Sequence, residues 1–253
     1  MNIKKLPSSR RGFPKKINSG AKHFPATKKW NCSYFLESMK SEKVRALPFS
    51  KIENRTPLFN QIHILKNQSQ IEIESILLHR YGEYVIREEV QILKNNQTLL
   101  EDINYTRPYG SLENLDFFHS FFFAPPGYTV EPHTDDLSLY LFQIKGKKVV
   151  RVVAPEFNNS VYRLSPQTTL EISMKEGLTL DQALLLSKQS KNWSISEANF
   201  FNIDLSRFDK MKNVDIYETE LNGGDILEIP QGWWHSTFTD EESFAFNVAK
   251  NKL

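Results

Sequence analysis

The chain has 253 residues, of which 40% are hydrophobic and 12% aromatic, so it can bury a substantial core in one large β domain or at most two small ones. No apolar run approaches the ~20 residues that a membrane helix requires, and the first residues lack the apolar core of a secretory signal. The single cysteine, Cys32, excludes an internal disulfide and fits a reducing compartment. We therefore expect a cytoplasmic protein with no membrane partner.

Charge is distributed unevenly along the chain. Residues 1–36 contain nine Lys or Arg and no acid, a net charge of +9, whereas the remainder has 23 basic and 30 acidic residues. A basic arm of this kind can contact nucleic acid, a ribosome or an acidic protein. The alternative is a solvated terminus without a partner, which we favour. We expect residues 1–12 to be disordered and 13–253 to form a single domain.

The elements before residue 124 are predicted from local patterns. The apolar spacing of Ile73, Ile76 and Leu77 indicates a helix. In chain order we expect a short helix over Asn31–Met39, a strand near Val44–Phe49, a helix around Gln70–Tyr81, an element of either type over Tyr84–Leu93, and a strand through the phenylalanines of 117–123.

A candidate metal-binding pair follows these elements. His133 and Asp135 are two residues apart, and residues i and i+2 of a strand point to the same side. They can therefore hold one ion together while Thr134 faces away. Most isolated His-x-Asp triplets are ordinary core or surface residues. Here, however, an apolar stretch at 139–144, a turn at 145–147 and a second apolar stretch at 148–153 predict a hairpin directly downstream.

A third candidate ligand, His235, lies about a hundred residues further on. Residues 156–222 are predicted to be an insertion between barrel strands, with a capping box at Thr179 that opens a helix ending near Lys188. A turn at 223–225, a short strand and a second turn then lead to His235. Two imidazoles and one carboxylate on one face of an ion are the arrangement used for non-haem Fe(II) and O2 chemistry. A barrel would bring such distant strands together.

Several stretches resemble the JmjC/cupin-type 2-oxoglutarate-dependent oxygenases, including the asparaginyl and ribosomal-protein hydroxylases of that family. They are Gly20–Trp30, Pro132–Val153, Gly223–His235 and Phe244–Val248. The resemblance implies a mainly β fold with flanking helices, a double-stranded β-helix of the jelly-roll or cupin type. It also implies an enzyme, a dioxygenase that uses Fe(II), 2-oxoglutarate and O2, with His133, Asp135 and His235 as the metal ligands and catalytic centre.

The same resemblance suggests residues that bind the cosubstrate. Lys148 occupies the position of a Lys or Arg that pairs with the distal carboxylate of 2-oxoglutarate, although a solvated hairpin lysine is the alternative. Asn247 corresponds to an Asn near the cosubstrate, or else is an edge-strand amide. Some relatives have a Thr three residues before the first His, where this chain has Val130 and places Thr129 one residue earlier. A contact to the cosubstrate from Thr129, Tyr140 or a tyrosine of 105–128 is therefore expected instead.

By analogy with the family, the leading hypothesis is hydroxylation of a side chain in a protein or peptide. The same chemistry on a small molecule, such as an amino acid or a natural-product intermediate, is the alternative. Demethylation of a methylated lysine ranks lower because no aromatic cage is recognisable. A hypothesis of another class is a non-catalytic cupin-like module that docks on nucleic acid through its basic N-terminus.

Overall fold

The structure, a computed structural model, describes most of the chain. The described residues are 2–39, 42–48, 62, 70–79, 84–88, 96–103, 118–189 and 194–249. The second half of the element predicted at 84–93 and the tyrosines of 105–117 lie outside these ranges.

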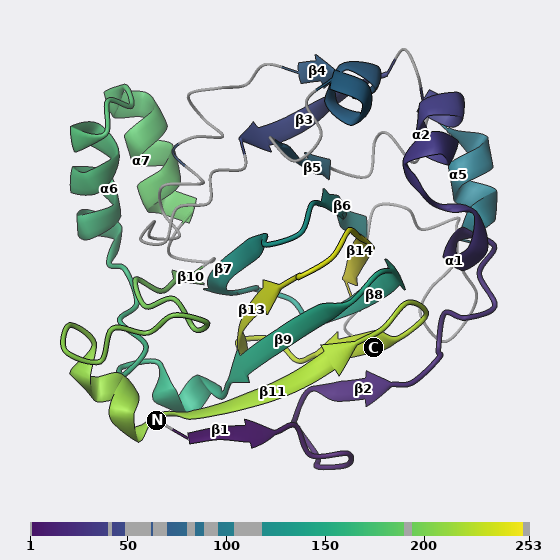
Figure 1. The fold of residues 1–253 in the computed structure, drawn as a ribbon. Coiled ribbons are helices and arrows are strands. Elements are labelled where there is room, and N and C mark those ends of the chain that lie inside the picture. The colour runs from purple at the N-terminus through teal and green to yellow at the C-terminus, as the bar shows by residue number, and fades with distance from the viewer. Residues whose placement is uncertain are drawn as a thin grey trace.

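Two facing β-sheets form the centre of the molecule (Figure 1). The six-stranded sheet contains, in spatial order, β1 (Asn2–Lys5), β11 (Asp215–Leu221), β9 (Lys148–Val153), β13 (Trp234–Phe238), β7 (Thr129–Thr134) and β10 (Ser194–Ile195). The eight-stranded sheet contains β2 (Lys15–Ile17), β12 (Ile226–Ile229), β8 (Leu139–Lys145), β14 (Ser243–Ala249), β6 (Phe118–Ala124), β5 (Tyr84–Glu88), β3 (Lys43–Pro48) and β4 (Gln70–Glu72).

Consecutive strands alternate between the two sheets from β6 to β9 and again from β11 to β14. β6, β8, β12 and β14 belong to one sheet, and β7, β9, β11 and β13 belong to the other. Neighbouring described strands run antiparallel, except that β1 and β11 run parallel. This alternation is the winding of a jelly roll, in which distant segments of the chain become neighbours. The predicted fold class, a jelly-roll or cupin-type double-stranded β-helix with flanking helices, is confirmed.

Side-chain parity determines which residues reach the space between the sheets. On β8, Tyr140 and Phe142 point outward into a core shared with the N-terminal helices, whereas Leu141 points inward. On β14, Phe246 points outward and Ala245 inward. Both faces of these strands are buried, which explains why they are apolar almost throughout. The interior between the sheets is therefore lined by alternate residues of each strand.

Helices cover the open sides of the sandwich (Figure 1). The helices α1 (Ala26–Lys29), α2 (Cys32–Met39) and α5 (Gln97–Asp102) lie on one side, and α6 (Pro166–Lys175) and α7 (Leu180–Gln189) lie on the other. Short helical turns are η1 (Ser75–His79), η3 (Pro155–Phe157) and η4 (Asp209–Asn213). The predicted capping box is present, since Thr179 and Gln182 exchange side-chain-to-backbone hydrogen bonds at the start of α7. Among the described residues no helix is long and apolar enough to cross a bilayer.

The structure differs from three predictions. Residues 1–12 are not wholly disordered, because β1 pairs with β11 and Leu6 is buried between the sheets. The helix predicted from residue 70 onward begins only after the edge strand β4, because apolar residues alternating at 71 and 73 fit a strand as well as a helix. The insertion 156–222 is shorter than predicted, since β11 belongs to the six-stranded sheet, between β1 and β9.

Candidate metal and cosubstrate site

The three predicted metal ligands meet at one end of the space between the sheets. His133 is the penultimate residue of β7, Asp135 directly follows that strand, and His235 lies on β13. β7 and β13 are antiparallel neighbours whose register pairs His133 directly with His235. Residues opposite each other in such a pair have side chains in contact, and the two imidazole centroids are 4.2 Å apart. The strand pairing thus brings together two residues that are separated by a hundred positions.

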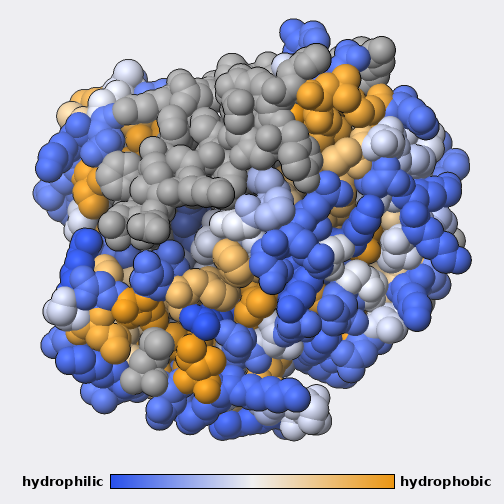
Figure 2. Space-filling view, in the orientation of Figure 1, coloured by the Kyte–Doolittle hydropathy of each residue, from blue (hydrophilic) through white to orange (hydrophobic). Residues whose placement is uncertain are grey.

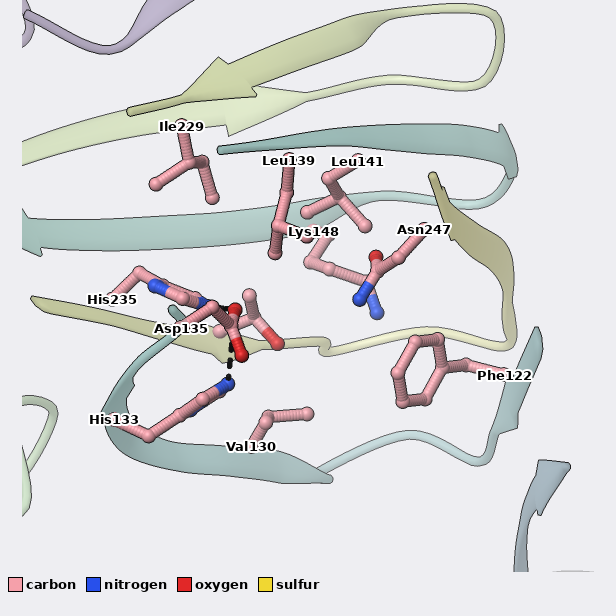
Figure 3. A pocket seen from close by; sticks show the side chains of 11 residues that line it. Phe122, Val130, His133, Asp135, Leu139, Leu141, Lys148, Ile229, His235 and Asn247 are labelled. Atoms are coloured by element: carbon pink, nitrogen blue, oxygen red, sulfur yellow. Dashed lines mark ion pairs between the residues drawn. The ribbon is translucent and has the colours of Figure 1, made fainter. Parts of the chain in front are cut away.

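The ligand atoms converge on a point (Figure 3). One carboxylate oxygen of Asp135 lies 3.2 Å from Nε2 of His235 and 3.9 Å from Nε2 of His133. All three ligand atoms lie within 4.8 Å of one another. Ligands about 2.1 Å from one ion and at right angles to each other are roughly 3 Å apart, so a small adjustment closes the set around a first-row metal.

Backbone contacts orient both imidazoles. Nδ1 of His133 lies 2.6 Å from the carbonyl oxygen of Glu131, and Nδ1 of His235 lies 3.1 Å from that of Trp233. A carbonyl oxygen only accepts, so each Nδ1 carries the proton and donates it. The Nε2 lone pairs are then directed at the shared point, as metal coordination requires.

A pocket of about 180 Å³ extends from the triad into the sandwich. Its lining residues come from both sheets and are Phe122, Val130, His133, Asp135, Leu139, Leu141, Lys148, Ile229, His235, Thr237 and Asn247. In Figure 3, Lys148 and Asn247 reach into the pocket from the side away from His133. The pocket therefore has a metal end and, deeper between the sheets, a second polar end.

Lys148 carries a buried positive charge at this second end. Only 3% of the residue is exposed, and burial lowers the pKa of its ammonium to about 8. The nearest recorded contact is the Phe122 ring, 5.9 Å from Nζ, and no carboxylate in the described part of the chain lies within ion-pair distance. A cation taken out of water without a counter-charge is costly. A ligand carboxylate would compensate it.

The β8–β9 hairpin places Lys148 in this position. Gly146 turns the chain with a φ of +74°, and a Cβ there would lie 1.9 Å from the carbonyl oxygen of Glu242. The turn therefore requires glycine. Along β9, Lys148, Val150 and Val152 are buried and the residues between them are partly exposed, which is the predicted alternation. Lys148 is an interior residue, whereas its neighbour Lys147 pairs with Glu220 at the surface.

Asn247 is a second polar group at this end without a full set of partners. Its Oδ1 is buried and accepts no hydrogen bond from the residues that the structure describes. β14 turns Asn247 inward together with Ala245, away from the outward-facing phenylalanines. A buried amide oxygen without a donor is expensive in a folded protein. Together with Lys148, it indicates that a polar ligand belongs in the pocket.

Neither Thr129 nor Tyr140, both predicted to contact the cosubstrate, lines the pocket. Tyr140 faces outward into the helix-covered core, and Val130 rather than Thr129 faces the pocket. A register shift between β13 and β7 makes three residues of β7 span two of β13, so Val130 and His133 share a face. The sequence alone did not reveal this bulge.

The pocket contains one hydroxyl that the sequence interpretation missed. Thr237 lies two residues after His235 on β13, lines the pocket and is 7% exposed. Its spacing from His235 could have predicted this, because residues i and i+2 on a strand share a face. The hydroxyl expected from β7 is thus present on the neighbouring strand.

A jelly roll that brings two histidines and a carboxylate together at one end of its interior is a cupin-type fold with a candidate metal site. Residues 9–251 match the family model described as Cupin-like domain, and the chain belongs to that family.

Similar proteins fall into two groups. The tRNA wybutosine-synthesizing protein 5 of Gallus gallus is 24% identical over 244 residues, covering 88% of this chain and 66% of that protein. Its counterpart in Homo sapiens is 25% identical over 205 residues, covering 81% of this chain and 54% of that protein. JmjC domain-containing protein D of Dictyostelium discoideum is 30% identical over 122 residues, 48% of this chain and 22% of that protein.

These relatives confirm the JmjC/cupin kinship and correct one prediction. The chain spans between about half and two thirds of the length of the wybutosine-synthesizing relatives. The expected protein or peptide substrate is contradicted, because the relatives that match most of the chain are named for wybutosine synthesis in tRNA. The sequence interpretation favoured a polypeptide substrate only by analogy with the family.

Proposed function

We propose that this protein is an Fe(II)- and 2-oxoglutarate-dependent oxygenase that hydroxylates a nucleoside of transfer RNA. The observation that carries the proposal is the buried ammonium of Lys148, which has no carboxylate partner among the described residues, at one end of a pocket whose other end holds the His133–Asp135–His235 triad. A dicarboxylic acid that coordinates a metal through one end and pairs with Lys148 through the other would satisfy both ends at once. A metal site alone does not require the lysine.

The residues have separate tasks. His133, Asp135 and His235 would hold the iron on one face and leave the opposite face for exogenous ligands. Lys148 would pair with the distal carboxylate, and Asn247 would hydrogen-bond to the cosubstrate. When bound, iron and 2-oxoglutarate together supply the means to activate O2, releasing CO2 and succinate and placing one oxygen atom in a C–H bond. The apolar walls at Leu139, Leu141 and Ile229 exclude water.

Thr237 completes the proposed cosubstrate contacts. It points into the same pocket as Lys148 and lies on the strand that carries His235. A hydroxyl can donate to a carboxylate oxygen while its methyl group packs on the apolar wall. We assign to Thr237 the contact that the sequence interpretation sought at Thr129.

The tRNA assignment is supported by the relatives that match most of the chain. An enzyme that modifies a nucleoside must receive it unstacked from its neighbours, in a pocket beside the reactive centre. Here the triad lies at one end of the interior pocket, close to the turns that flank β7 and β13. The tRNA itself would remain outside.

The test is to incubate the protein with Fe(II), 2-oxoglutarate, O2 and tRNA isolated from cells. The tRNA is then digested to nucleosides, and mass spectrometry follows the gain of one oxygen atom alongside succinate formation. Both products should require metal and 2-oxoglutarate and be absent with His133→Ala. An oxygen gain in a metabolite of a cell extract, with none in tRNA, would reassign the substrate to a small molecule. Binding of tRNA without any turnover would leave a non-catalytic module and overturn the proposal.

A further inference from the structure

A second cavity of about 450 Å³ lies between the N-terminal segment and the six-stranded sheet. The N-terminal segment lines it with Lys4 and residues 10–13. The opposite wall comes from β11, from residues 154–156 that follow β9, and from Trp233. We call it the N-terminal cavity. It shares no lining residue with the pocket of the metal triad.

Two guanidinium groups at this cavity are available for an anion. Arg10 and Arg11 are exposed, and neither forms an ion pair with any residue that the structure describes. Lys4, by contrast, is neutralised by Asp215 at 2.5 Å. Glu156 also lines the cavity and offsets one arginine, so the three basic and two acidic lining residues give a net charge of +1. The cavity lies on a segment, residues 1–36, that contains no acidic side chain.

Aromatic rings form the floor beneath these arginines. The guanidinium of Arg10 lies 4.1 Å from the centroid of Phe13, which makes edge contacts with Tyr217 and Trp233 at 5.2 and 4.9 Å. Phe13 and Tyr217 are partly exposed. Arginine combined with aromatic rings is the composition of surfaces that bind single-stranded nucleic acid, since the charge holds phosphates and the rings hold bases.

The N-terminal cavity is joined to the metal site through Trp233. The indole N–H of Trp233 donates to the carbonyl oxygen of Gly12 at 3.1 Å, and its backbone carbonyl accepts the proton of Nδ1 of His235. Two residues of extended chain span roughly 6–7 Å. Trp233, which lines the cavity, is therefore close along the chain to the metal ligand His235. Figure 2 shows hydrophilic side chains along the edge of the molecule formed by β1 and β2, which belong to this segment.

We propose that the N-terminal cavity binds the phosphate backbone of the RNA substrate, with Arg10 and Arg11 as the phosphate ligands, beside the nucleoside that enters the metal pocket. The inference rests on the proposed function, since it takes tRNA as the substrate. It also favours a nucleic-acid contact for the basic N-terminus over the solvated terminus preferred from the sequence. The reason is that β1 and the Trp233–Gly12 hydrogen bond fix that segment next to the reactive centre. A solvated tail would not be held there.

The experiment measures the affinity of the full chain for an unmodified tRNA transcript at several salt concentrations. Replacing both arginines (Arg10→Ala with Arg11→Ala) should weaken binding roughly twentyfold at 0.1 M salt. The plot of the log of the binding constant against log salt should also become shallower, its negative slope shrinking in magnitude by about 1.4. These are the values expected for two lost phosphate contacts. The double lysine variant keeps the charge and should retain most of the slope. Circular dichroism verifies that each variant folds.

A matched control removes the same charge elsewhere. Lys22 and Lys28 are exposed, belong to the same basic segment and make no recorded ion pair; Lys28 is in α1, far from the start of β1 in Figure 1. Their double alanine variant should stay within about threefold of the unaltered protein. An unchanged affinity and slope in the arginine variant, or an equal loss in the control, overturns the proposal. Because these results are read from binding, they are distinguishable from failure of the proposed function, which is absence of turnover by the unaltered protein.

Discussion

The two ends of the interior pocket differ in how completely the protein satisfies its own polar groups. At the metal end, both imidazoles donate to backbone carbonyls and both approach the same carboxylate. At the deeper end, the Lys148 ammonium has no carboxylate partner among the described residues, and Oδ1 of Asn247 is buried without a donor. The metal end is thus oriented before anything binds, whereas the deeper end is incomplete by itself.

This difference teaches which interactions position a ligand and which require one. Preformed hydrogen bonds hold ligand atoms in place and reduce the reorganisation needed on metal binding. Unpaired buried groups have the opposite effect, since they destabilise the ligand-free protein and are relieved by a complementary ligand. The pocket therefore predicts opposite consequences for substitutions at its two ends. Substitutions at the metal end should abolish metal binding and turnover. Substitutions at the deeper end should lower the affinity for the cosubstrate and stabilise the ligand-free protein.

The largest effect is expected at the metal end. His133→Ala removes one of three ligands and should lower both metal affinity and succinate formation roughly a thousandfold or more, since loss of a supporting partner alone costs 10–100-fold. Calorimetric titration with a divalent metal measures the first quantity and turnover the second. The matched control is His23→Ala, at an exposed histidine outside the pocket, which should change neither. Retention of metal binding by His133→Ala would contradict the assigned ligand set.

At the deeper end, Lys148→Met should weaken 2-oxoglutarate binding about a hundredfold, the value of a buried charge-assisted contact. The same variant should be more stable than the unaltered protein when empty, by about 1–3 kcal/mol, because it removes a buried cation that has no carboxylate partner in the described part of the chain. Thermal unfolding with and without 2-oxoglutarate measures both effects.

The hairpin neighbour provides the control for this variant. Lys147→Met removes the same charge at the surface, where Lys147 pairs with Glu220, and should leave cosubstrate affinity unchanged. A destabilised Lys148→Met protein would mean that the ammonium already has a favourable environment, and the comparison between the two ends would then fail.

The sequence predicted the metal end more fully than the deeper end for a physical reason. His133 and Asp135 are related by local strand geometry, and the three ligands need only a fold that brings β7 and β13 together. Thr129, Tyr140 and Thr237 depend on details that are not local. A bulge on β7 turns Val130 inward, and the helix-covered outer core takes up Tyr140. Register and bulges depend on tertiary pairing, which a single sequence does not specify.

The fold shows the same distinction. The hairpin of β8 and β9 was predicted because apolar runs on either side of a glycine turn are a local signal. β1 was missed because its residues are exposed and polar, and it is held by pairing with β11, more than two hundred residues away. β11 was assigned to an insertion because its sequence, with three acidic residues among seven, lacks the apolar run of a buried strand. Long-range pairing determined both strands.

The pH dependence of cosubstrate binding sharpens the comparison further. Burial lowers the pKa of Lys148 to about 8, from an ordinary value of 10.5, so the folded, empty protein loses this proton first as pH rises. Stability of the empty protein should therefore increase between pH 8 and 10.5. Affinity for 2-oxoglutarate should be constant below pH 8 and fall up to about tenfold per pH unit above it, because the carboxylate binds the ammonium form.

Isothermal titration across this range, with metal and without O2, provides the measurement. The Lys148→Arg variant is the control, since guanidinium stays protonated and its affinity should not follow the same titration. A pH profile shared by both proteins would assign the titration to another group.

The smallest effect is expected at Thr237. Thr237→Val keeps the shape of the side chain and removes only the hydroxyl, so 2-oxoglutarate affinity should fall about fivefold, the value of one hydrogen bond, with metal affinity unchanged. Thr129→Val makes the same chemical change on β7, at a position that the pocket does not include, and should have no effect. The pair identifies the strand on which the hydroxyl matters, because the two variants make the same chemical change on neighbouring strands, β13 and β7. Equal losses in both, or a loss at Thr129 alone, would mean that β7 supplies the contact and that its bulge turns a different residue inward when the cosubstrate binds.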